Sequence, residues 1–174
     1  MTGHPEARTS IGTPSGGALW LAVAGSCFIL LGGLVAAVTD PLDLHRGSWL
    51  AAYMVLVCGV AQFVMGRAPS WFDDPVNPRL AWTQLIGWNA GNVLVMVGTL
   101  TELPNLVDLG GVILFVILID MLRDSMRRSG PPANAMPDAE SDVRRWIRWG
   151  YRSLLVLLVV SIPVGLVLAH LRVD

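Results

Sequence analysis

Charged residues are scarce in this chain. Of its 174 residues only 14% are charged while 53% are hydrophobic, and the mean hydropathy is +0.58. A soluble domain of this size rarely has such a composition, whereas a set of membrane-spanning helices does. The formal net charge is −1 and no basic patch with interleaved aromatic residues occurs, so the sequence predicts no nucleic-acid partner.

The chain also lacks lysine and nearly lacks cysteine. All twelve basic residues are arginine, and the two cysteines, Cys27 and Cys58, lie inside apolar runs without CxxC or other metal-ligand spacing. We therefore expect both to be buried structural thiols. The sequence contains no nucleophile elbow, phosphate-binding loop, dinucleotide fingerprint or HExxH pair, which favours a protein that is not an enzyme.

Long apolar runs, in contrast, are abundant. A helix that crosses a bilayer needs about 20 predominantly apolar residues. We predict an all-α integral membrane bundle of five transmembrane helices, forming one domain over residues 18–170 after a disordered cytoplasmic tail over residues 1–17. The first run is too long for a cleaved signal peptide, and no A-x-A site follows it. The predicted spans cover residues 18–38, 48–66, 82–100, 106–122 and 151–169.

Polar side chains inside these spans are the candidate functional residues. The central span, 82–100, carries no charge but contains three amides. An unpaired amide in hydrocarbon costs several kcal/mol, so these side chains should face other helices or a cavity. The fourth span carries an acid near its end, one turn before Arg123, where it can pair or reach water. The intramembrane polar set is Gln62, Gln84, Asn89, Asn92 and Asp120.

Small residues follow one stripe of each of the first two spans, which lets neighbouring helices approach closely. On the first span this predicted packing stripe is Ala18, Ala22, Gly25, Ile29, Gly32 and Ala36, opposite a lipid face of Leu19, Val23, Cys27, Leu30, Leu34 and Val38. On the second span an α-helix would put Ser48, Ala52, Val55, Gly59, Gln62 and Gly66 toward protein and Leu50, Met54, Val57, Ala61 and Val64 toward lipid.

Residues 123–150 are predicted to form a cytoplasmic linker followed by a short basic amphipathic helix. Three prolines mark the linker, and Asp138 is placed to cap the helix. A helix with aromatic and aliphatic residues on one face and arginines on the other is typical of a segment lying on an anionic membrane surface. The predicted lipid-headgroup contacts are Arg144, Arg145, Arg148 and Arg152.

The arginines predict the orientation of the spans. With the amino terminus inside, ten arginines in short connections are cytoplasmic and only Arg46 and Arg172 are outside. The positive-inside rule therefore predicts a multi-pass protein of the plasma membrane, with a cytoplasmic amino terminus and an external carboxyl terminus. This orientation places a cluster of charged residues and histidines at the outer rim of the membrane. The cluster consists of Asp40, Asp43, His45, Arg46, Glu102, Asp108 and His170.

Histidine is a common ligand of metals and haem, and His45 and His170 are the pair at this rim. Both lie at the membrane edge, whereas helix-packed sites need inward-facing ligands. The strings DLHRGSWLAAYMVLVCGVAQFVMG, WNAGNVLVMVGTL and DLGGVILFVILID resemble small multi-pass proteins similar to the haem-binding helical bundles of respiratory oxidases. The resemblance covers the second to fourth spans and implies haem b, with His45 as the residue carried over.

Three functions remain open from the sequence. The favoured one is a non-enzymatic accessory or assembly component of a membrane complex, in contact with anionic headgroups and with other membrane subunits or itself. A haem-b or metal-binding redox protein that uses His45 at the outer face is the first alternative. The second is a small channel or transporter subunit lined by Gln62, Gln84, Asn89 and Asn92, whose amides could equally be interhelical hydrogen-bonding groups.

Overall fold

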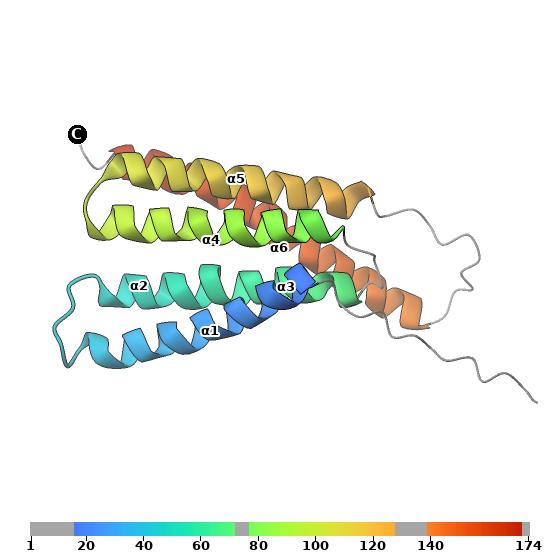
Figure 1. Cartoon of the computed structure of the whole chain (residues 1–174), viewed down its shortest axis with the longest axis horizontal. Helices are drawn as coiled ribbons and strands as arrows, with labels where there is room; N and C mark the ends of the chain where they lie inside the picture. The colour runs from blue at the N-terminus through green and yellow to red at the C-terminus, as the bar shows by residue number, and fades with distance from the viewer. Residues whose placement is uncertain (1–15, 72–76, 128–138, 172–174) are drawn as a thin grey trace, which may run out of the picture.

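Helices make up the fold in the part of the chain that the computed structural model describes, residues 16–71, 77–127 and 139–171 (Figure 1). The tail predicted over residues 1–17 and the linker prolines lie almost entirely outside those residues. The elements are α1 (Gly16–Thr39), α2 (Gly47–Tyr53), the π-helix η1 (Met54–Ala61), α3 (Gln62–Trp71), α4 (Pro78–Leu100), α5 (Pro104–Arg127) and α6 (Ala139–Leu171).

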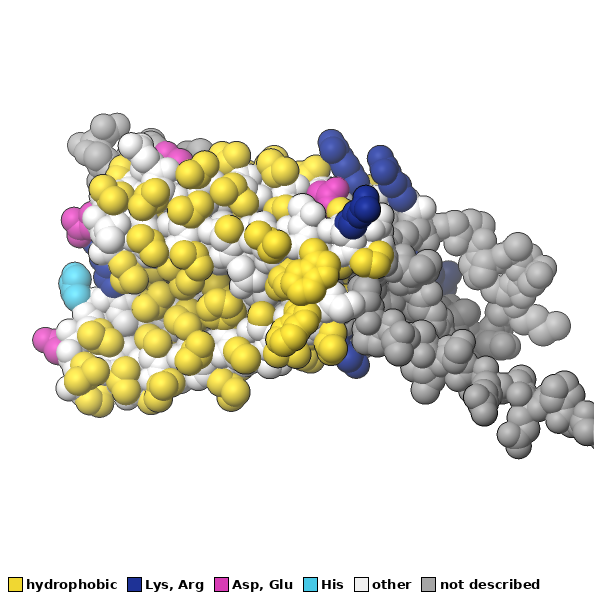
Figure 2. All heavy atoms as spheres, in the orientation of Figure 1, with side chains coloured by type: hydrophobic (Ala, Val, Ile, Leu, Met, Phe, Trp, Pro, Cys, Tyr) yellow, Lys and Arg dark blue, Asp and Glu magenta, His cyan; other side chains and the backbone are white. Residues whose placement is uncertain are grey.

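These elements run the length of one bundle five times in alternating directions (Figure 1). The segment α2–η1–α3 is continuous over residues 47–71 and is called the second rod below. One end of the bundle, the loop end, holds the connections 40–46 and 101–103. The opposite end, the arginine end, holds the end of α3, the start of α4, the end of α5 and the start of α6, and Figure 2 shows arginines gathered there.

The described helices have the composition of a membrane protein. Four stretches are long and apolar enough to cross a membrane: Gly16–Thr39, Gly47–Ala68, Pro104–Arg127 and Arg145–Val164. Between the two ends, hydrophobic side chains cover the face shown in Figure 2, and this surface is called the apolar belt. The central helix α4 is not among the four because its amides and threonines lower its hydropathy, so a fifth crossing stays a prediction.

Close helix contacts in α1 follow the small-residue stripe predicted from the sequence. Gly25 and Gly32 are buried, whereas Leu30 and Leu34 on the opposite face are exposed. A Cβ on Gly25 would lie 2.6 Å from the Phe63 backbone nitrogen on α3, so the two backbones are in contact there. The predicted burial of Cys27 is wrong: it lies on the apolar belt, whereas Cys58 is fully buried.

The second rod departs from the pattern predicted for an α-helix. Ser48 and Ala52, predicted to face protein, are exposed, whereas Ala61, predicted to face lipid, is 2% exposed and lies in the core. The reason is η1, whose hydrogen bonds reach the fifth residue rather than the fourth. Its wider turns rotate the chain less per residue, so residues before and after η1 do not share one α-helical stripe: Gly59, Gln62 and Gly66 are buried as predicted, whereas Ser48 and Ala52 are not.

α4 and α5 form an antiparallel hairpin, as the short connection between them predicts (Figure 1). Asn77 caps α4 by accepting a hydrogen bond from the Arg79 backbone nitrogen at 3.0 Å, and Pro78 occupies the first turn. Glycines of the two helices meet backbone to backbone, because a Cβ on Gly110 would lie 2.7 Å from the Gly91 carbonyl oxygen. This contact fixes the register of the hairpin.

α6 is one helix of 33 residues where the sequence predicted a surface helix followed by a separate span. The only residue between the two that strongly disfavours helix is Gly150, which costs about 1 kcal/mol, too little to end a helix that packs against the bundle. The helix also continues through Pro163. The basic segment therefore extends the axis of the apolar one in this structure.

The core lies where α3, α4, α5 and α6 meet. Trp88, Leu118 and Leu155 are fully buried at its centre, with Ala61 and Met65 of the second rod packed against them. Apolar contacts thereby hold α6 to the bundle. They also hold the face of α4 that carries Trp88 against the interior.

The glycine contacts of α1 give a first prediction. We expect Gly25→Ala to lower the free energy of unfolding by about 1–3 kcal/mol, because the added methyl group meets backbone atoms that cannot move aside. Gly33, on the same helix, is the matched control, since a Cβ there meets nothing within 4 Å. Gly33→Ala should change stability by less than about 1 kcal/mol and toward greater stability. Denaturation of the detergent-purified protein, followed by circular dichroism, measures both; equal effects would contradict the prediction.

Candidate functional site: polar side chains inside the bundle

One stripe of α4 carries polar side chains into the interior. Gln84, Trp88 and Asn92 follow one another at intervals of about one turn and are 7%, 0% and 1% exposed. Their spacing of four residues puts them on one face, the same face that packs against the core. Asn89 lies outside this stripe, is half-buried, and donates to the Leu85 carbonyl of its own helix at 2.8 Å.

Asn92 joins α4 to the second rod. The Tyr53 hydroxyl donates to Asn92 Oδ1 at 2.8 Å, and Asn92 Nδ2 donates to the Trp88 carbonyl at 2.8 Å. Both ends of the amide are therefore satisfied. Tyr53 is held in place by stacking on Trp49, with ring centroids 5.3 Å apart. Sequence reasoning did not identify Tyr53, because a lone tyrosine in an apolar run is more often an interfacial residue.

Gln84 joins α4 to α5. Its Nε2 donates to Asp120 Oδ2 at 3.3 Å. The sequence suggested that Asp120 pairs with Arg123 or reaches water, whereas its partner in the structure is this amide. The signal that predicts the pair was available: Gln84 and Asp120 are equidistant in sequence from Glu102, at the turn of an antiparallel hairpin. Residues equidistant from such a turn lie at the same level.

Gln62 is fully buried, and no residue that the structure describes hydrogen-bonds its Oε1 or its Nε2. The indole Nε1 of the fully buried Trp88 likewise has no acceptor in the described part of the chain. Of the amides predicted to line a channel, the structure therefore buries Gln62, Gln84 and Asn92 and leaves Asn89 half-buried, bonded to its own helix.

At the loop end the structure brings together two members of the predicted rim cluster. Arg46 Nη2 lies 2.6 Å from Glu102 Oε1, and Arg46 Nη1 donates to the Thr99 carbonyl, so the turn before α2 is tied to the α4–α5 hairpin. His45 is exposed in that turn, and the side chain of His170 lies outside the described residues. No group of three or more His, Cys, Asp or Glu with metal-binding geometry occurs among the described residues.

The arginine end combines cations with exposed aromatic rings. Arg145 is exposed, Arg148 is half-buried, and Trp146 and Trp149 are exposed on the same stretch of α6. Arg152 Nη2 donates to the Ser125 carbonyl at 2.8 Å, which ties α6 to α5. The side chain of Arg144 lies outside the described residues. Headgroup contacts by these arginines stay a prediction.

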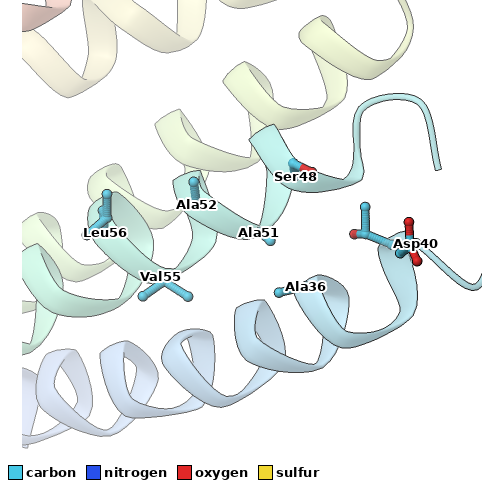
Figure 3. A pocket seen from close by; sticks show the side chains of 8 residues that line it. Ala36, Asp40, Ser48, Ala51, Ala52, Val55 and Leu56 are labelled. Atoms are coloured by element: carbon cyan, nitrogen blue, oxygen red, sulfur yellow. The ribbon is translucent and has the colours of Figure 1, made fainter. Parts of the chain in front are cut away.

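A shallow groove of about 510 Å³ opens sideways between α1 and the second rod near the loop end (Figure 3). Most of its lining side chains are small, because the two helices diverge there and no large residue fills the space. It is lined by Ala36, Thr39 and Asp40 of α1 and by Ser48, Ala51, Ala52, Val55 and Leu56 of the second rod.

The hydrogen bond between Tyr53 and Asn92 gives a second prediction. Tyr53→Phe and Asn92→Leu should each lower stability, and the double variant should lose less than the sum. The coupling free energy should be about 0.6 kcal/mol, as for other hydrogen bonds between membrane helices. Unfolding of the purified variants in detergent gives this double-mutant cycle. The matched cycle of Tyr53→Phe with Asn89→Leu should be additive, because Asn89 bonds within its own helix; coupling there, or none at Asn92, would contradict the assignment.

Comparisons of the chain with protein-family models, with curated proteins and with solved structures found no match. The resemblance to haem-binding bundles of respiratory oxidases therefore stays an expectation from the sequence.

Proposed function

We propose that the protein is an integral membrane protein of five crossings that serves as a non-enzymatic accessory or assembly component of a membrane complex. The observation that carries the proposal is the apolar belt, interrupted by the groove between α1 and the second rod. Exposed large side chains such as Leu30 and Leu56 are unfavourable in water and favourable in lipid. The groove gives this otherwise lipid-facing surface one place suited to a helix of another protein.

The fifth crossing is α4. It packs along α5, which has the length and composition of a span, and only residues 101–103 separate the two helices. A bilayer that encloses α5 therefore also encloses α4. The polar side chains that lower its hydropathy, Gln84 and Asn92, are buried between helices, so lipid does not meet them.

The arginine distribution supports a cytoplasmic arginine end. The described arginines at that end lie near the ends of α3, α4 and α5 that meet there and on the first half of α6, whereas Arg46 lies at the loop end. Anionic lipids of the cytoplasmic leaflet attract such cations by about 1 kcal/mol each near the surface. Trp146 and Trp149 beside them are suited to the headgroup layer of the plasma membrane.

The groove supports a docking role. Ser48 and Ala52 leave room for a second backbone, and the exposed Gly33 and Ala37 of α1 form a small-xxx-small pair next to it. A partner helix with its own small residues can make close van der Waals contact with the floor of the groove. Lipid tails fill such a narrow groove less favourably, because they lose conformational freedom there.

The orientation yields a third prediction. In a background in which both native cysteines are alanine, Leu42→Cys in the loop-end connection should react with a membrane-impermeant maleimide in intact cells. Met126→Cys, exposed on the last turn of α5, should react only after the membrane is permeabilised. Labelling of both sites in intact cells would contradict an odd number of helices between them.

A photo-crosslinking amino acid gives the fourth prediction and tests docking. Placed at Ala52 in the groove, it should form a discrete protein adduct in native membranes, identified by mass spectrometry as one membrane polypeptide or as a second copy of this chain. Placed at Ala90, which is also exposed but lies on α4, it should give lipid adducts only.

A further variant separates specific docking from chance collision. Ala36→Leu fills the groove from the α1 side and should remove the Ala52 adduct without altering the fold. An Ala52 site that gives only lipid adducts, or an adduct that survives Ala36→Leu, would overturn the docking proposal and leave the five-crossing proposal standing.

A further inference from the structure

Among the described residues, three buried side-chain atoms have no hydrogen-bond partner: Oε1 and Nε2 of Gln62 and Nε1 of Trp88. Both side chains are 0% exposed. Leaving a buried amide or indole N–H unpaired is costly, and the other buried amides, Gln84 and Asn92, both have partners. Gln62 and Trp88 therefore need a partner that the described side chains do not supply.

Gln62 and Trp88 lie in the same layer of the bundle. Tyr53 on the second rod bonds Asn92 on α4, and from that pair the second rod runs toward the arginine end, antiparallel to α4. Gln62 comes nine residues later, and η1 rises less per residue than an α-helix, so Gln62 reaches the level of the turn between Gln84 and Trp88. Trp88 packs in one core cluster with Ala61 and Met65, which flank Gln62 on its own helix.

The π-helix is what points Gln62 inward. In an α-helix, residues nine positions apart lie on opposite sides, so Gln62 would face away from the side where Tyr53 meets α4. The lower rotation per residue of η1 brings Gln62 back toward that side and into the core. A rare backbone conformation that buries an amide without a protein partner is typical of a functional position.

The chemistry of the three atoms selects the ligand. Two of them, Gln62 Nε2 and Trp88 Nε1, are donors, and Gln62 Oε1 is an acceptor. A cation is disfavoured by the donors, and an anion by the acceptor. We propose that Gln62 and Trp88 bind an internal water molecule, which accepts from Nε1 of Trp88 and donates to Oε1 of Gln62. Buried waters typically make about three hydrogen bonds to groups of this kind.

This water would lie between two hydrogen-bonded pairs along α4. Tyr53 and Asn92 lie on the loop-end side of it, and Gln84 and Asp120 lie on the arginine-end side. The proposal does not depend on docking at the groove, which is on the opposite side of the second rod from α4.

The fifth prediction is an NMR test on the full chain in nanodiscs with isotope-labelled tryptophan. The indole N–H signal of Trp88, assigned with Trp88→Phe, should show a cross-peak to a long-lived water. Gln62→Leu should abolish that cross-peak and shift the indole proton upfield. Asn89→Leu, one residue from Trp88 but already bonded within its helix, should leave both unchanged.

Several results would overturn the water site. A wild-type indole with no water cross-peak, or with a direct contact to the Gln62 side chain instead, shows that no water bridges the two. A cross-peak that survives Gln62→Leu shows that Gln62 does not hold the water. If Gln62→Leu does not fold, Gln62→Met keeps the chain length and removes both amide atoms, and the wild-type spectrum alone still decides whether the water is present.

Discussion

A buried polar group without a partner costs more than a single apolar contact returns, and the interior of this bundle is arranged around that constraint. The face of α4 that points inward carries Gln84, Trp88 and Asn92, so its neighbours must present polar groups at the same levels. Tyr53 does so for Asn92, and Asp120 does so for Gln84. The polar contacts thereby fix the rotation of α4 and its height relative to α5 and the second rod.

Close backbone contacts at glycines supply the attraction between helices that apolar burial does not supply in a membrane. Lipid tails are as apolar as leucine, so apolar surface alone does not hold membrane helices together. Glycines at Gly25, Gly91 and Gly110 let backbones meet directly, and the Arg46–Glu102 ion pair ties two connections at the loop end. Where glycine and alanine face outward instead, as at Gly33 and Ala52, we propose that a helix from another protein docks.

Much of the fold was predictable from local patterns. Apolar runs separated by prolines gave the helices, the small-residue stripe of α1 gave its packing face, and the short connection gave the α4–α5 hairpin. The second rod was predicted less well, because a rotation of about 100° per residue is assumed in any stripe and η1 does not obey it. The surface helix was predicted as separate because its residues alternate like an amphipathic segment, yet nothing in the chain breaks α6 before the apolar stretch.

The candidate site likewise has features that the sequence predicts and features that only the tertiary structure shows. The sequence by itself determined that the chain is helical, that its composition suits a membrane and that arginines gather in particular connections, because these follow from composition and from the order of residues along the chain. Only the tertiary structure decided that Asn92 bonds Tyr53, that Asp120 bonds Gln84 and that the amide of Gln62 and the indole N–H of Trp88 have no hydrogen-bond partner among the described residues. Those outcomes depend on the relative rotation and height of helices far apart in sequence, which are set by glycine contacts between helices and by one π-helix, and no periodicity within a single segment encodes them.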